Sequence, residues 1–139
     1  PLYLLTWKLA PALAAGNSVV AKPSEVTPLS AWLLSEILLE AGVPPGVVNI
    51  VHGRGASAGA TLVGHRQIKA VSFTGSTATG AAIAAATAGQ FKKLSLELGG
   101  KNATLVYADA DIELAAREAA RAAFSNQGQI CLCGSRILV

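Results

Sequence analysis

An α/β fold, built as an open parallel sheet with helices on both faces, is predicted by three features of the 139-residue sequence. Short β-branched runs alternate along the chain with longer segments of helical periodicity, which is the order that produces parallel sheets. Glycine and proline mark several of the boundaries between them. Hydrophobic residues make up 52% of the chain and charged residues 14%, which excludes disorder and favours elements covered on both faces. A sheet of this kind binds its ligand beyond the carboxyl ends of the strands.

The first strand, helix and second strand follow one another directly. Residues 18–22 are a β-branched run, and Thr27 with Pro28 supplies an N-cap and a proline at the first helical position. Apolar residues then recur at helical spacing until Gly42 ends the pattern. Residues 47–51 are predicted to form the second buried strand.

The alternation continues to the C-terminus. A glycine-spaced turn at residues 53–59 precedes a short helix, a strand at residues 70–73 and an alanine-rich helix after Gly75. Residues 93–98 alternate with a period of two, which predicts a strand with Glu97 on its polar face. The remaining elements are a strand at residues 104–107, a helix capped near Asp111 that runs to about Phe124, and a strand that begins near Arg136. No element follows that last strand to pack against it, so we expect the chain to be a fragment.

Composition excludes several classes of partner. The net charge of +3 arises from eleven basic and eight acidic residues without a basic run, so no nucleic acid is expected. The apolar stretches are too short to span a membrane and no secretory signal is present, which predicts a soluble, cytoplasmic protein. Cys131 and Cys133 are separated by one residue, and His52 and His65 are isolated, so neither a disulfide framework nor a metal site is predicted.

The segment around Gly75 and Ser76 places a glycine at the end of a strand and hydroxyl groups where the next helix begins. Backbone amides and the helix dipole at such a turn favour an anion, for example a pyrophosphate. The segment lacks the spacing of the established dinucleotide and phosphate loops. An ordinary capped turn, with glycine for close packing, explains the residues equally well.

Lys22 and Glu25 stand at the carboxyl end of the first predicted strand. A carboxylate at this edge could accept hydrogen bonds from ribose hydroxyls and would repel a 2′-phosphate, which favours NAD over NADP. The alternative is a solvated charge pair at the entrance to a helix, since surface charges seldom need a function.

Glu97 and Cys131 are the candidate catalytic residues. Glu97 ends an apolar strand before two glycines, surroundings that suit a general base, although an ion-paired structural glutamate fits the local sequence as well. Cys131 follows a polar, helix-breaking segment unlike the surroundings of a core cysteine, yet a buried, inert cysteine is the usual role of a free thiol. Cys133 fits the inert role more naturally.

Four motifs, taken together, resemble those of the aldehyde dehydrogenases in order and spacing, and the resemblance covers practically the whole chain. The glutamate signature at residues 96–101 and the cysteine signature at residues 126–131 are the most specific of them. The opening residues 1–8 and the pair of cysteines look closest to the 2-aminomuconic semialdehyde dehydrogenase branch. The other two motifs are residues 22–25 and 73–77.

The resemblance implies a mechanism. Cys131 would add to the aldehyde carbon, and the resulting thiohemiacetal would pass a hydride to the nicotinamide ring and leave a thioester. Glu97 would then activate water to release the acid. Family members that pass the acyl group to coenzyme A generally lack this glutamate, so its presence implies hydrolytic release.

The resemblance also implies how the chain is divided. Residues 1–98 would form a Rossmann-like NAD-binding portion, and residues 99–139 would begin a second, catalytic α/β domain. Lys22 and Glu25 would hold the adenosine ribose and Gly55 would lie near the adenine, while Gly75 and Ser76 would lie at the pyrophosphate. The full-length protein is expected to be a homo-oligomer that acts on an aldehyde, with a muconic-type semialdehyde as the narrower expectation.

The chain departs from the family at its ends. The family's oxyanion-hole asparagine falls before residue 1, and the loss of one such donor can cost roughly 10²- to 10³-fold in rate. The isolated chain is therefore open to a second interpretation, as a truncated, catalytically incompetent nucleotide-binding module. A third interpretation, a relative of the acyl-phosphate reductases, would share the cysteine chemistry without needing Glu97.

Overall fold

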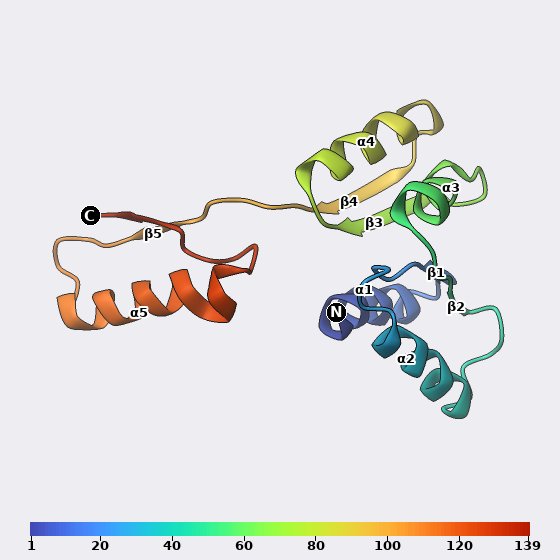
Figure 1. The fold of residues 1–139 in the computed structure, drawn as a ribbon, viewed down its shortest axis with the longest axis horizontal. Helices are drawn as coiled ribbons and strands as arrows, with labels where there is room; N and C mark the ends of the chain where they lie inside the picture. The colour runs from blue at the N-terminus through green and yellow to red at the C-terminus, as the bar shows by residue number, and fades with distance from the viewer. The chain divides into compact units, whose positions relative to one another are not determined.

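The computed structural model describes residues 1–139 and contains three successive strand–helix–strand motifs (Figure 1). In each motif the two strands that flank the helix are hydrogen-bonded to each other. The motifs are β1 (Val19–Ala21), α2 (Leu29–Glu40) and β2 (Val48–Ile50); β3 (Ala70–Thr74), α4 (Thr77–Thr87) and β4 (Lys93–Glu97); and β5 (Ala103–Leu105), α5 (Ile112–Phe124) and β6 (Arg136–Leu138). A helix α1 (Leu2–Ala14) precedes them, and a π-helical turn (Gly55–Gly59) with α3 (Ala60–Gly64) connects the first motif to the second.

The strands pair in parallel, as predicted. The β1–β2 and β5–β6 pairs are parallel in register. In the β3–β4 pair, Lys93 N donates to Lys69 O at one end and Gly75 N donates to Glu97 O at the other, both at 3.0 Å, so these strands also run in one direction. The predicted α/β class is therefore confirmed. The hydrogen bonding stays within three pairs and does not extend into one continuous ladder.

The start of α2 differs from the prediction. Thr27 was expected to cap the helix, but Pro28 occupies the N-cap position and no side chain caps this end. Thr27 N donates to Ser24 O at 3.2 Å, which closes a turn before the helix begins. The Pro28 carbonyl accepts from the amides of Ala31 and Trp32, because the backbone of this proline already has a helical conformation.

Helix α5 was predicted from the sequence, whereas helix α1 was not. The cap of α5 is as predicted, since the Asp111 carboxylate accepts a hydrogen bond from the amide of Leu114 at 3.0 Å. Helix α1 was not predicted, and Pro11 lies in its interior, where a proline removes one helical hydrogen bond. The carbonyl of Pro11 still accepts from Ala15 N at 3.1 Å, so the helix continues past the proline.

The chain divides into two compact units. Unit 1 contains residues 1–74 and 78–96, and unit 2 contains residues 75–77 and 97–139. The buried side chains are Leu9, Ala31, Ile83 and Thr87 in unit 1, and Ala119 and Cys133 in unit 2.

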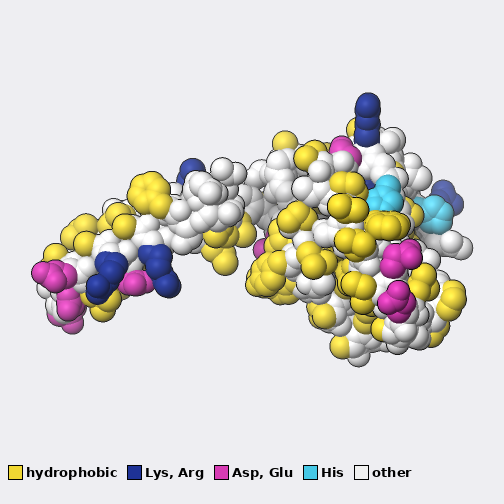
Figure 2. Space-filling view, turned by 60° about the horizontal axis from the view of Figure 1, so that its bottom comes forward, with side chains coloured by type: hydrophobic (Ala, Val, Ile, Leu, Met, Phe, Trp, Pro, Cys, Tyr) yellow, Lys and Arg dark blue, Asp and Glu magenta, His cyan; other side chains and the backbone are white.

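Apolar side chains also lie on the surface of both units. Trp7 and Trp32 of unit 1 are 59% and 48% exposed, and Phe124 of unit 2 is 76% exposed. Figure 2 shows hydrophobic side chains over much of the visible face. The apolar faces of α1 and α2 are thus incompletely covered within this chain. None of the helices has the length and apolar character that crossing a bilayer requires.

Candidate functional site

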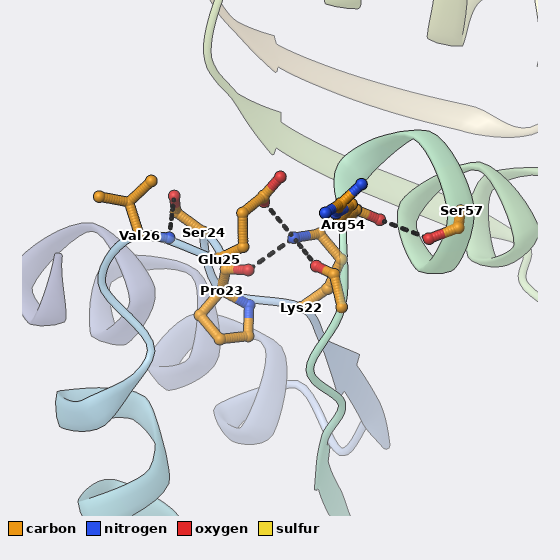
Figure 3. A network of polar contacts seen from close by, with 8 residues as sticks. Lys22, Pro23, Ser24, Glu25, Val26, Arg54 and Ser57 are labelled. Atoms are coloured by element: carbon orange, nitrogen blue, oxygen red, sulfur yellow. Dashed lines mark hydrogen bonds and ion pairs between the residues drawn. The ribbon is translucent and has the colours of Figure 1, made fainter.

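Lys22 lies immediately after β1, where three oxygen atoms hold its ammonium group (Figure 3). Its Nζ donates to the carbonyl of Pro23 at 2.6 Å and to that of Gly53 at 3.1 Å, and lies 3.5 Å from Oε2 of Glu25. An ammonium group has three N–H donors, so these partners satisfy it. Because Gly53 follows β2, the Lys22 side chain ties together the loops at the carboxyl ends of β1 and β2.

The Glu25 carboxylate is ionised more readily than that of an ordinary glutamate. Hydrogen bonds from the backbone amides of Glu25 itself and of Gly55, with the nearby charge of Lys22, hold the pKa of this carboxyl below its ordinary value of 4.5. A lowered pKa in the folded chain means that these interactions are present at neutral pH and are lost as the pH falls through the lowered value. The side chain is 49% exposed, so the charge remains accessible to a ligand.

Gly55 reaches this position because the loop after β2 turns sharply at Gly53. The φ of Gly53 is 149°, and a Cβ there would lie 2.7 Å from the Cβ of Ala58, so only glycine fits. Gly55 then begins the π-helical turn that leads into α3. Lys22, Glu25 and Gly55, predicted from separate parts of the sequence, are thus brought together in unit 1.

Gly75 and Ser76 form the connection between β3 and α4, as predicted. Gly75 N donates to the carbonyl of Glu97 at 3.0 Å, which places the main chains of two predicted site residues side by side in unit 2. This amide is engaged with the neighbouring strand, although the sequence suggested backbone amides of this turn as ligands for an anion.

Cys131 and Cys133 differ in exposure, and neither forms a disulfide. Cys131 is exposed, whereas Cys133 is 7% exposed and its Sγ lies 3.7 Å from the carbonyl of Ser125. The carbonyl of Cys131 accepts a hydrogen bond from Nδ2 of Asn102 at 2.6 Å. Asn102 was not predicted as a site residue, and its one signal in the sequence is its place directly after the glutamate motif.

The loop between α5 and Cys131 has an unusual backbone. Asn126, Gln127 and Gly128 are successive residues with φ of 48°, 57° and 73°, all in the left-handed region. This region costs a residue other than glycine roughly 1–2 kcal/mol. Gln129 N donates to Asn126 O at 2.9 Å and closes the turn. The turn ends the helical segment and leads the chain to Cys131.

Glu97 is the last residue of β4, and its side chain is exposed. Glu97 and Cys131 both belong to unit 2, and they make no hydrogen bond with each other. A hollow of about 350 Å³ in unit 2 lies between β5 and α5, and neither residue lines it. The mechanism that the resemblance implies requires both side chains to reach the same acyl group, and this stays a prediction.

Packing beside Cys133 requires a glycine at position 134. A Cβ on Gly134 would collide with Oγ1 of Thr104 and would lie 3.5 Å from the Cβ of Ala122. We expect Gly134→Ala to destabilise the chain by about 1–3 kcal/mol, measured by urea unfolding, because β5 and α5 would have to separate. Gly89→Ala is the control, since nothing lies within 4 Å of a Cβ there.

The double variant Gly134→Ala/Thr104→Ala removes the colliding hydroxyl. It is expected to recover part of the lost free energy of unfolding. A single variant Gly134→Ala that is as stable as the Gly89→Ala control contradicts the packing argument.

Comparison with known proteins extends these observations. The chain matches the aldehyde dehydrogenase family over residues 1–139. It is 60% identical over 139 residues to the 2-aminomuconic semialdehyde dehydrogenase of Danio rerio, and 55% identical to the Homo sapiens protein of the same name, with 100% of this chain and 28% of each relative covered. The chain therefore spans about 28% of the length of these relatives.

One solved structure is similar to this chain in both fold and sequence. The crystal structure of PnpE in complex with nicotinamide adenine dinucleotide is similar with a TM-score of 0.92 and 52% sequence identity, over 99% of this chain and 28% of that one. The resemblance to the family, inferred from the four motifs, is confirmed. The resemblance to the 2-aminomuconic semialdehyde dehydrogenases, inferred from residues 1–8 and the pair of cysteines, is confirmed as well. The chain belongs to the aldehyde dehydrogenase family.

Proposed function

We propose that this chain carries NAD-binding residues and the nucleophile of an enzyme that oxidises an aldehyde, of the muconic semialdehyde type, to a carboxylic acid. The observation that carries the proposal is the convergence of Lys22, Glu25 and Gly55 at the carboxyl ends of two parallel strands. That edge is where α/β sheets bind their ligands. The names of the relatives support the substrate class.

The residues at this edge suit the adenosine half of NAD. The ionised carboxylate of Glu25 can accept hydrogen bonds from the ribose hydroxyls and would repel the 2′-phosphate of NADP. Lys22 is saturated by its three partners, and the longest of these contacts, 3.5 Å to Glu25, is the one that a ribose hydroxyl would replace most easily. Gly55 leaves room beside the adenine, and Gly75 and Ser76 are proposed to lie at the pyrophosphate. The NAD complex of PnpE supports this cofactor.

The chemistry is proposed to begin at Cys131. Its thiolate forms a bond to the aldehyde carbon, and loss of a hydride from that carbon leaves a thioester on the sulfur. NAD supplies the hydride acceptor. Glu97 takes a proton from water, which attacks the thioester, breaks the carbon–sulfur bond and releases the acid. The exposure of Cys131 and the burial of Cys133 support the choice of nucleophile. Residues 1–98 are thereby proposed as the cofactor-binding portion and residues 99–139 as the beginning of the catalytic domain.

Calorimetric titration with NAD, alongside turnover of a short aldehyde, tests the proposal. Binding accompanied by NAD-dependent oxidation supports it. Binding without oxidation favours the alternative, a catalytically incompetent nucleotide-binding module of the same fold. A chain that does not bind NAD contradicts both.

The role of Glu25 in cofactor choice gives a specific prediction. We expect Glu25→Gln to lower NAD affinity about tenfold and to raise NADP affinity, because the charge that binds hydroxyls and repels phosphate is removed. In the unaltered chain NAD affinity should fall as Glu25 becomes protonated, and because the pKa of this carboxyl is lowered, that fall should come at a more acidic pH than for an ordinary glutamate. Glu36→Gln, on the exposed surface of α2, is the matched control. Equal effects of the two variants would argue against a ribose-binding carboxylate.

A further inference from the structure

The hydrogen bond between Asn102 and Cys131 connects two parts of unit 2 that are far apart in sequence. Nδ2 of Asn102 donates to the carbonyl of Cys131 at 2.6 Å, across 29 positions. A carbonyl oxygen only accepts, so the asparagine must present its N–H₂ group to it. An alanine has no donor here, and an aspartate would turn a carboxylate oxygen toward the carbonyl.

Asn102 is itself held firmly. Its carbonyl accepts from Arg136 N at 3.1 Å, and the next residue, Ala103, pairs with Arg136 in the β5–β6 ladder. The carbonyl of Lys101 also accepts from Nε of Arg136 at 2.9 Å. The side chain of Asn102 therefore extends from a fixed strand end.

The loop that carries Cys131 makes few hydrogen bonds to the rest of unit 2 apart from that of Gly134 N, which donates to the carbonyl of Ala122 at 3.1 Å. The other hydrogen bonds of residues 129–133 stay between residues 125 and 135, as in the bonds from Gln129 N to Asn126 O and from Cys133 N to Ile130 O. The left-handed turn that begins at Asn126 opposes this arrangement energetically. For residues 129–133, the hydrogen bond from Asn102 is the one that connects the loop to the end of β5.

We propose that Asn102 is a positioning residue: it holds the peptide group after Cys131 and thereby keeps this thiol at the surface while Cys133 stays buried. The inference rests on the proposed function, because this hydrogen bond matters for catalysis only if Cys131 is the nucleophile. Fixing one peptide group fixes the direction of the neighbouring side chain, which is how a support residue orients a reacting group.

Alkylation of the 139-residue chain by iodoacetamide, with Cys131 and Cys133 quantified separately by peptide mass spectrometry, tests the proposal. The unaltered chain is expected to react at Cys131 more than tenfold faster than at Cys133, because one thiol is exposed and the other buried. Asn102→Ala and Asn102→Asp should each reduce this preference roughly five- to tenfold. Asn102→Gln, which keeps a primary amide, should restore part of it.

A matched control separates positioning from general loss of structure. Asn17→Ala removes a similar bond, from an asparagine Nδ2 to the carbonyl of Ala12 at 3.1 Å, in unit 1. It is expected to leave the preference unchanged, and melting temperatures of all variants are compared. The proposal is overturned if Asn102→Ala keeps the preference of the unaltered chain, or if the preference falls equally in the control, or if Asn102→Gln recovers nothing.

Repeating the alkylation with NAD or a short aldehyde present distinguishes the two levels of inference. If these ligands protect Cys131 and the Asn102 variants do not change the alkylation preference, the positioning role is contradicted and the proposed function stands. A preference that depends on Asn102, without protection by either ligand, overturns Cys131 as the nucleophile and with it the catalytic meaning of the Asn102 hydrogen bond.

Discussion

Cys131→Ser is expected to lower aldehyde oxidation by roughly 10³-fold or more while NAD binding stays unchanged. A thiolate is the attacking species, and a serine hydroxyl without a base to activate it is a far weaker nucleophile at neutral pH. The residues proposed to bind the cofactor lie elsewhere in the sequence, so calorimetry should give the same affinity for both chains. Turnover is followed by NADH absorbance and the thiol by stoichiometric alkylation.

Cys133→Ser is the matched control for this substitution. Cys133 is buried and its Sγ faces the carbonyl of Ser125, an acceptor that a hydroxyl can also use. This variant should therefore keep most of the activity and the reactive thiol. If Cys133→Ser removes the activity and Cys131→Ser does not, the two cysteines have been assigned the wrong roles.

Glu97→Gln is expected to slow the release of the acid roughly 10²- to 10⁴-fold and to leave the first turnover nearly unchanged. A glutamine cannot take a proton from water, so the acyl group should remain on the sulfur of Cys131. Rapid mixing with aldehyde and NAD should then give a burst of one NADH per chain. Intact-mass measurement should show the acyl adduct.

The control for Glu97→Gln is Glu113→Gln, in the first turn of α5 and exposed. This variant should turn over continuously, without a burst. A Glu97→Gln chain that also turns over without a burst would support the acyl-phosphate reductase interpretation, in which this glutamate is not needed. A Glu97→Gln chain that gives neither a burst nor turnover would mean that Glu97 acts before the thioester forms.

The strand–helix–strand motifs could be predicted because the residues of each motif alone determine its strands and its helix. Apolar runs and helical spacing define β1, α2 and β2 without reference to the rest of the chain, and Asp111 marks the start of α5. The position of Lys22 and Glu25 followed from the rule that places ligands beyond parallel strands. Helix α1 escaped prediction because its proline contradicts the local rules for a helix.

Residues whose roles depend on distant partners could not be predicted. The need for glycine at position 53 becomes visible only with Ala58 beside it, and that at position 134 only with Thr104 of β5 and Ala122 of α5 beside it. Asn102 is recognised only from the carbonyl that it holds. Periodicity and motif spacing describe neighbours along the chain, whereas these three residues are defined by neighbours in space.

The pairing of each strand with the next one along the chain has a consequence for how the polypeptide folds. Val19 lies opposite Val48, and Ala103 lies opposite Arg136, so each ladder closes a loop of moderate length and does not wait for a distant segment. Such segments behave as separate foldons, so amide exchange in the β1–β2 ladder should be governed by a different opening event from that in the β5–β6 ladder.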